Sequence, residues 1–201
     1  PCPSDAAVVT ITVLTDADAG VDGASTLCST NSPVTLFGLL QGTPDPGGIW
    51  LAPNGSAFAG TFDAAVHPQG VYTYVLVVPA PCINDTALVT MGVVQAVDAG
   101  SNGTATLCSD DAPISLFGQL GGAPNAGGTW AGPGGFNGTT FDPSLNAPGV
   151  FTYTLVGTSP CPNSTAQVTV AVNPLPNAGT NGSTTVCPEA PPVQLFGLLG
   201  G

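Results

Sequence analysis

The chain has 201 residues, twelve acidic side chains and neither lysine nor arginine, which gives a formal net charge of −12. This charge argues against nucleic-acid binding, which depends on cationic contacts to phosphate, and it disfavours electrostatic binding to anionic membrane surfaces. No stretch approaches the roughly 20 apolar residues of a membrane-spanning helix, so membrane insertion is not expected either.

A motif that opens with Thr-Leu-Cys or Thr-Val-Cys and closes with Leu-Phe-Gly occurs three times, over residues 26–38, 106–118 and 185–197. The copies recur with a period of about 80 residues, which indicates a tandem array. We therefore predict four segments: the last strand of a preceding repeat over 1–17, one repeat over 18–97, a second over 98–176, and the first two strands of a further repeat over 177–201.

Each repeat reads as short strands separated by turns rich in Gly and Pro. Residues 7–14 form a β-branched segment that aligns with 87–94 and 166–175, where it closes a repeat. The strands expected within the first repeat cover 25–28, 34–40, the Trp50 segment, 70–77 and the closing segment. No window has the apolar period of a helix, so we expect no helix anywhere.

About seven short strands in a repeat, with a Trp on the third and an aromatic strand before the last, predict an all-β fold of tandem immunoglobulin-like β-sandwiches. We expect Trp50 and Trp130 to fill the cores. The Leu-Phe-Gly motif is expected to supply a core layer opposite the Trp, through Phe37, Phe117 and Phe196.

The run Cys…Pro-Val-x-Leu-Phe-Gly…Gly-Gly-x-Trp…Phe-Asp…Pro-Gly-Val-x-Thr-Tyr…Cys-Pro, ending in Asn-Pro-Leu-Pro at 173–176, covers the whole chain. It resembles the Ig-like repeats of very large secreted adhesins of gliding Bacteroidetes. The resemblance implies an outer-surface protein exported by the type IX system, whose tandem modules form a filament or stalk.

Six cysteines fall two per period, which is typical of an oxidising compartment. Three pairings keep the period. The within-repeat scheme joins Cys28–Cys82 and Cys108–Cys161; the across-junction scheme joins Cys2–Cys28, Cys82–Cys108 and Cys161–Cys187; the third joins Cys28–Cys161.

The expected topology places Cys28 and Cys82 at opposite ends of a sandwich. A strand of about seven residues spans ~23 Å, whereas a disulfide needs Cα atoms within ~7 Å, so the within-repeat bond is disfavoured. The third scheme leaves four cysteines without a partner in the chain. We favour the across-junction scheme because it alone uses every thiol present.

No catalytic, cofactor-binding or metal-binding residues are predicted, and we expect no enzymatic activity. Asp16, Asp18 and Asp22 suggest a calcium site, but the acidic cluster does not recur with the repeat, so they are interpreted as turn residues. The sole histidine, His67, has no recurring partners. Core packing is preferred to a sugar-stacking role for Trp50 and Trp130.

Six Asn residues lie in N-glycosylation sequons, although Asn-Gly is equally turn chemistry: Asn54, Asn84, Asn102, Asn137, Asn163 and Asn181. Asp85-Thr86-Ala87 resembles an O-glycosylation signal of Bacteroidetes, centred on Thr86. Glycans would hydrate a surface that is poor in charge.

The leading prediction is a structural module of an extracellular filament or giant surface adhesin, whose partners are copies of itself or adjacent repeats of a longer chain. The strand-like ends predict exchange of strands with neighbouring units or continuation of the array. Alternatives are a glycan- or surface-binding module and a spacer attached to a secreted enzyme.

Overall fold

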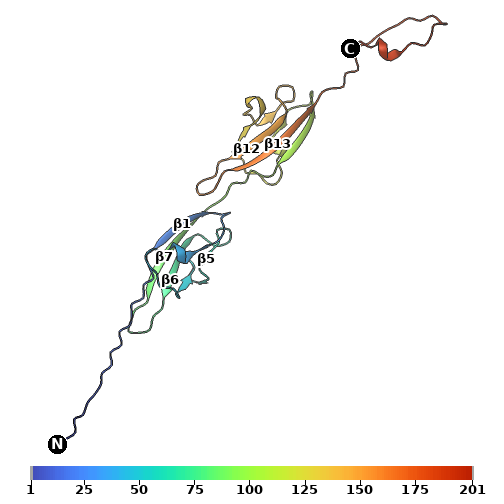
Figure 1. Ribbon diagram of the computed structural model, residues 1–201. Helices are drawn as coiled ribbons and strands as arrows, with labels where there is room; N and C mark the ends of the chain where they lie inside the picture. Colours follow the sequence, from blue (N-terminus) through green and yellow to red (C-terminus); the bar gives the residue numbers. More distant parts are fainter. Residues whose placement is uncertain (1, 201) are drawn as a thin grey trace. The chain divides into compact units, whose positions relative to one another are not determined.

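The computed structural model describes residues 2–200 and contains two compact units (Figure 1). Unit 1 consists of the residues up to Val97 together with Val156–Ser164. Unit 2 consists of Asp98–Leu155 together with the residues from Thr165 onward. A loop of the second sequence repeat therefore belongs to the compact unit built by the first. The predicted repeat boundaries themselves stay a prediction.

Unit 1 is a sandwich of a five-stranded sheet, in the order β1-β7-β6-β3-β4, and a two-stranded sheet, β2-β5. Its strands are β1 (Gly23–Cys28), β2 (Val34–Thr35), β3 (Ile49–Leu51), β4 (Ala57–Phe58), β5 (Thr61–Phe62), β6 (Gly70–Leu76) and β7 (Asp85–Val94). Turns separate the short strands, as the Gly- and Pro-rich sequence predicts.

Unit 2 repeats this plan with a four-stranded sheet, β10-β12-β13-β8, and a two-stranded sheet, β11-β9. Its strands are β8 (Gly103–Cys108), β9 (Ile114–Ser115), β10 (Thr129–Ala131), β11 (Thr140–Phe141), β12 (Gly149–Leu155) and β13 (Ser164–Asn173). Residues 2–200 contain no α-helix, and none of their helical turns has the length and apolar character needed to span a bilayer.

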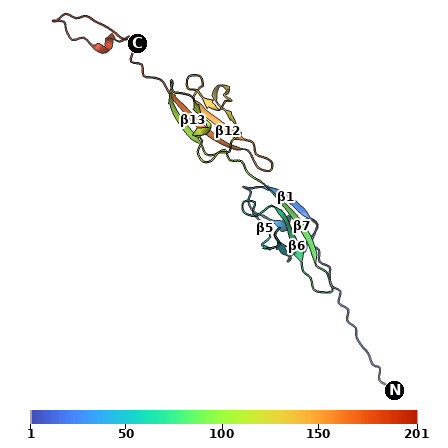
Figure 2. The same ribbon diagram turned by 180° about the vertical axis from the view of Figure 1, so that it is seen from behind.

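The first strand of each unit pairs in parallel with the last strand of the same unit. β1 lies beside β7 in both Figure 1 and Figure 2, with Gly23 opposite Val89 and Cys28 opposite Val94. β8 pairs with β13 in the same way, and Cys108 is opposite Asn173. Each cysteine that ends a first strand is thus fixed beside the end of the last strand.

The core of unit 1 lies between the inward faces of these two sheets. Alternate residues of β7 are buried (Ala87, Val89 and Met91), as are Tyr72 and Tyr74 of β6. Trp50 is 8% exposed and Trp130 is 5% exposed. Period-two burial on paired antiparallel strands is the pattern of a sheet with one face on a core. The all-β, tandem immunoglobulin-like fold predicted from the sequence is confirmed.

The Leu-Phe-Gly motif departs from the predicted strand over residues 34–40. Extended pairing ends at Thr35, and Leu36–Leu39 form a 3-10 turn (η1). The turn directs Leu36 into the core at 0% exposure and leaves Phe37 36% exposed, with its ring edge-on to Tyr74. The core assignment of Phe37 is therefore wrong, because the backbone no longer alternates there.

The second copy of the motif behaves similarly, since Leu116 is buried while Phe117, in the 3-10 turn η2 (Phe117–Gln119), is half-buried against Tyr153. The third copy forms the turn η4 (Leu195–Leu198), and Phe196 is 87% exposed. The core assignment of Phe196 is also wrong, because no sheet covers this turn among the described residues. A fourth 3-10 turn, η3 (Pro133–Gly135), follows β10.

The segment 7–14 has the sequence of a closing strand but forms none in the structure. Val9 and Ile11 are 84% and 82% exposed, whereas their repeat equivalents Val89 and Met91 are 0% and 1% exposed. The buried copies lie between β1 and β6, which supply both hydrogen-bonding edges. The predicted strand is absent because a strand forms only against such partners.

Candidate functional site

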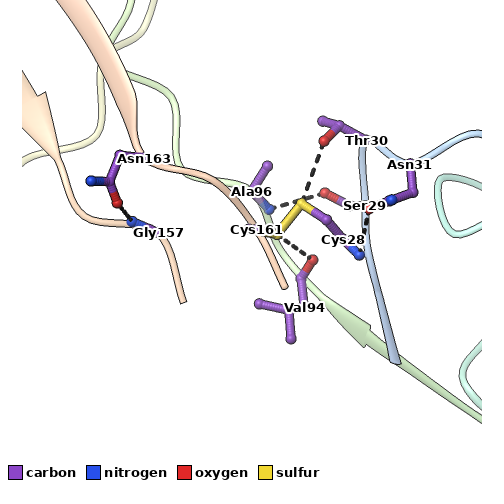
Figure 3. Close-up of a disulfide and its surroundings, with 9 residues drawn as sticks. All are labelled: Cys28, Ser29, Thr30, Asn31, Val94, Ala96, Gly157, Cys161 and Asn163. Atoms are coloured by element: carbon purple, nitrogen blue, oxygen red, sulfur yellow. Dashed lines mark hydrogen bonds between the residues drawn. A yellow bond between two sulfur atoms is a disulfide. The ribbon is translucent and has the colours of Figure 1, made fainter. Parts of the chain in front are cut away.

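The most distinctive site is the disulfide between Cys28 and Cys161, two cysteines that are 133 residues apart in the sequence (Figure 3). Cys28 ends β1, and Cys161 lies in the loop between β12 and β13. This loop is the part of the second repeat that belongs to unit 1. The Cα atoms are 4.9 Å apart, and the two residues are 1% and 6% exposed.

A tight turn presents Cys28 to its partner. The backbone N–H of Cys28 donates to Asn31 Oδ1 (2.9 Å), and the N–H of Asn31 donates to the Cys28 carbonyl (2.9 Å). Ser29 N–H donates to the Val94 carbonyl (2.9 Å), which continues the β1–β7 pairing by one residue. An Asn side chain that caps its own turn is common where a strand must stop abruptly.

Polar groups surround the two sulfur atoms (Figure 3). The Thr30 hydroxyl lies 3.4 Å from Cys28 Sγ and must be the donor, because a disulfide sulfur carries no proton. Cys161 Sγ lies 3.3 Å from the Val94 carbonyl oxygen, which is a close contact without a hydrogen bond for the same reason. The disulfide therefore packs against the end of β7.

The loop that carries Cys161 is closed by its own hydrogen bonds. Gly157 N–H donates to Asn163 Oδ1 (3.0 Å), and Cys161 N–H donates to the Thr158 carbonyl (2.8 Å). A Cβ atom on Gly157 would overlap the Pro162 carbonyl oxygen, so only glycine allows the two arms of the loop to approach this closely. We call residues 157–163 the cysteine hairpin of the second repeat.

The pairing favoured from the sequence is wrong for the two bonds that would use Cys28 and Cys161, namely Cys2–Cys28 and Cys161–Cys187. Cys2, Cys82, Cys108 and Cys187 are all unbonded, so the predicted Cys82–Cys108 bond is also absent. The favoured scheme needed the last strand of one repeat beside the first strand of the next. Each first strand instead pairs with the last strand of its own unit.

The strand register of unit 1 also separates Cys28 from Cys82. Cys28 is opposite Val94 at the end of β7, whereas Cys82 precedes β7, which begins at Asp85. The whole of β7 lies between these two places, and a strand of this length spans about 30 Å at the usual rise. A bond between Cys28 and Cys82 would have to span the length of the sandwich.

Two of the three acidic residues weighed as calcium ligands, Asp18 and Asp22, accept backbone hydrogen bonds instead. Asp18 Oδ1 accepts from Gly20 N–H and Asp22 Oδ1 accepts from Leu88 N–H, each at 2.8 Å. A different acidic group gathers at Cys108 with Asp110 and Asp111, but all three side chains are exposed. The equivalent positions after Cys28 are Thr30 and Asn31, so the group does not recur with the repeat.

The sequon residues lie on the surface. Asn54, Asn84, Asn102, Asn137, Asn163 and Asn181 are all exposed, as is Thr86. Several of these Asn side chains accept backbone hydrogen bonds; Asn84 Oδ1, for example, accepts from Val78 N–H at 3.0 Å. The single histidine has a similar role, because His67 Nδ1 accepts from Asp63 N–H at 2.9 Å.

The fold and this disulfide define a chain of tandem Ig-like domains. No protein-family model and no curated protein matches the chain. Among solved structures it is similar to an I-band fragment of titin, at 9% identity and a TM-score of 0.45, over 76% of this chain and 63% of that one. It is also similar to the N-terminal four Ig domains of a Dscam1 isoform, at 17% identity and a TM-score of 0.40, over 79% of this chain and 45% of that one. The chain spans less than two thirds of either structure's length.

Proposed function

We propose that the chain is a structural module of an extracellular filament or giant surface adhesin, in which disulfides tie consecutive repeats together. The observation that carries this proposal is the bond between Cys28 of the first repeat and Cys161 of the second. Such a bond changes the path by which a pulling force is transmitted along the chain.

The bond gives tension a short covalent path. A pull applied outside the two repeats passes through β1 to Cys28, crosses to Cys161, and leaves through β13. Residues 29–160 form a closed loop outside this path and cannot be drawn out while the bond is intact. The two cysteines are 133 residues apart. A fully extended chain of that length measures about 450 Å. While the bond is intact, these residues do not add to the extended length of the protein.

The composition and chemistry support a place outside the cell. Disulfides persist in oxidising compartments, and the absence of Lys and Arg removes every site for trypsin-like proteases. The likeness of the motifs to repeats of gliding Bacteroidetes adhesins supports export by the type IX system. The division into segments 1–17, 18–97, 98–176 and 177–201, self-association and glycosylation of the exposed sequons are parts of this proposal.

Single-molecule extension tests the mechanical role. The chain is pulled from handles at its two ends, first oxidised and then with a reductant present. We expect the oxidised chain to reach a contour length shorter by about 450 Å than the reduced chain. A double variant, Cys28→Ser with Cys161→Ser, should show the long contour under both conditions. Equal contour lengths for the oxidised and reduced wild-type chain would refute the proposal.

A further inference from the structure

Four Asn-Gly pairs occur in the chain, and the structure separates them into two kinds. They begin at Asn54, Asn102, Asn137 and Asn181, and all four Asn residues are exposed. Asn-Gly pairs are prone to spontaneous deamidation, because a glycine without a Cβ atom leaves its backbone nitrogen open to the preceding side chain. The four pairs differ in how firmly the Asn side chain is held.

The side chain of Asn102 is held at the start of a strand. Its Oδ1 accepts from Gln167 N–H (2.8 Å), and the following residue, Gly103, begins β8. The same bond recurs in unit 1, where Asp22 Oδ1 accepts from Leu88 N–H (2.8 Å). Because both units make this bond, it belongs to the shared fold and not to one loop.

The side chain of Asn54 is held in the connection between β3 and β4. Its Oδ1 accepts from both the N–H (3.0 Å) and the hydroxyl (2.7 Å) of Ser56. The nitrogen that would have to attack is engaged as well, since Gly55 N–H donates to the Ala52 carbonyl (2.8 Å). The amide carbon of Asn54 therefore cannot turn toward this nitrogen unless hydrogen bonds break.

Asn137 and Asn181 have no such restraint. Within residues 2–200, neither side chain makes a hydrogen bond. Asn137 lies between η3 and β11, on the wall of an open hollow in the surface of unit 2. Asn181 follows the isolated bridge between Thr180 and Gly200 and lies in no strand.

We propose that Asn137 and Asn181 are sites of spontaneous deamidation, and that the fold protects Asn54 and Asn102. The nitrogen of the following glycine attacks the Asn Cγ atom, the Cγ–Nδ2 bond breaks, and ammonia leaves with the glycine proton. Water then opens the succinimide ring at either carbonyl, which gives aspartate or isoaspartate. In sum, an amide and water become a carboxylic acid and ammonia, without an oxidant. This inference goes beyond the proposed function.

The protected pairs lie where the product would disturb a sheet. Isoaspartate adds a methylene to the backbone, which at Asn102 would shift the start of β8 from its register with β13. Deamidation at Asn137 and Asn181 instead changes segments outside the strands and adds a negative charge at each. The surface of a long-lived chain would therefore become more acidic while the strand pairing is kept.

Incubation in ¹⁸O-labelled water tests the proposal, because each new deamidation takes up the label. Chain from a host without N-glycosylation is kept in mildly alkaline buffer, either folded or in urea, and is then digested with pepsin in acid, where the reaction is slow. In the folded chain we expect label at Asn137 and Asn181 to rise at least about five-fold faster than at Asn54 and Asn102, the factor for one hydrogen bond of about 1 kcal/mol. In urea the four rates should converge.

Two variants test the physical cause. Ser56→Ala removes the hydroxyl bond to Asn54 Oδ1 and should speed the deamidation of Asn54 alone. Gly138→Ala places a Cβ atom 3.4 Å from the Phe136 ring, which is an ordinary contact. It should slow the deamidation of Asn137 and leave that of Asn181 unchanged.

Three results would overturn the inference: equal rates at all four sites in the folded chain, faster conversion at Asn54 or Asn102, or no change at Asn54 in the Ser56→Ala variant. Detection of the intact Cys28–Cys161 bond in each sample of folded chain shows that it has folded. The extension experiment depends on that bond and not on these amides, so either proposal can fail without the other.

Discussion

Two equivalent tyrosine hydroxyls, those of Tyr74 and Tyr153, fasten a loop to the core of each unit. The Tyr74 hydroxyl donates to the Asp45 carbonyl and accepts from Gly48 N–H, both at 2.8 Å. Tyr74→Phe removes both bonds and leaves the Gly48 N–H without its partner. We expect unit 1 to lose about 1–3 kcal/mol of unfolding free energy, measured by urea denaturation. Tyr153→Phe should destabilise unit 2 by a similar amount, and a negligible effect of both would contradict this role.

Tyr72 makes the stability of unit 1 sensitive to alkali. Its side chain is fully buried, its hydroxyl donates to the Pro68 carbonyl (2.8 Å), and burial raises its pKa above the ordinary value of 10.0. Because its pKa is raised, the neutral Tyr72 hydroxyl contributes to the stability of unit 1 at every pH below the ordinary pKa. This contribution is lost as the pH rises through the folded-state pKa. Unit 2 has Phe151 at the equivalent position. Tyr72→Phe should therefore make the unfolding temperature of unit 1 fall less steeply above about pH 10.

His67 acts as a hydrogen-bond acceptor that unit 2 replaces with an amide. Its Nδ1 accepts from Asp63 N–H, and Asn146 Oδ1 accepts from Asp142 N–H at 2.8 Å. His67→Asn should therefore preserve most of the stability of unit 1, whereas His67→Ala should cost about 1 kcal/mol more. Thermal unfolding of the two variants compares them directly, and equal losses would show that the ring contacts matter more than the acceptor.

In each unit, the first strand packs closely against the turn formed by the Leu-Phe-Gly motif. A Cβ atom on Gly23 would overlap the Leu39 carbonyl oxygen, and one on Gly103 would overlap the Gln119 carbonyl oxygen. Gly23→Ala should thus displace β1 and cost about 3 kcal/mol or more. Gly38→Ala is the matched control, because its Cβ would meet only Thr35 Oγ1, at 3.5 Å. Denaturation midpoints that shift equally would contradict the account.

The strands were predictable where a segment alternates between core and solvent over several residues, as in β7 and β12. The Leu-Phe-Gly turn was not, because Leu36 and Phe37 read as a continuing strand, and only η1 shows which of them faces the core. The parallel pairing of β1 with β7 was also missed. Alternation of apolar and polar residues predicts a strand, but it does not predict which other strand it pairs with. The pairing depends on the path of the intervening chain.

At the scale of the whole molecule, the disulfide is expected to raise stability by restricting the unfolded chain. The chain-entropy relation gives up to about 5 kcal/mol for a loop of this length. The double variant Cys28→Ser with Cys161→Ser should lower the urea midpoint accordingly. The control Cys2→Ser with Cys187→Ser alters two exposed, unbonded cysteines and should leave the midpoint unchanged. A double variant as stable as wild type would show that the bond constrains little.

The cysteine pairing marks the limit of the sequence argument. Spacing alone allowed three periodic schemes, and the one that used every thiol in the chain was favoured. That criterion failed because the bond follows strand pairing within unit 1. β1 ends beside Val94, and Cys161 of the loop 157–163 also contacts Val94. The sequence did predict that Cys28 and Cys82 lie at opposite ends of a sandwich. This excluded the within-repeat pairing but did not choose between the across-junction pairing and Cys28–Cys161.

The central claim is that a disulfide joins consecutive repeats through Cys28 and Cys161. Non-reducing digestion at Asp, followed by mass spectrometry of chain purified from an oxidising compartment, tests it most directly, because trypsin has no site to cut. We predict a crosslinked pair of peptides that carry Cys28 and Cys161 and that separates on reduction. A crosslink of Cys28 to Cys82 or to Cys2 would contradict the claim.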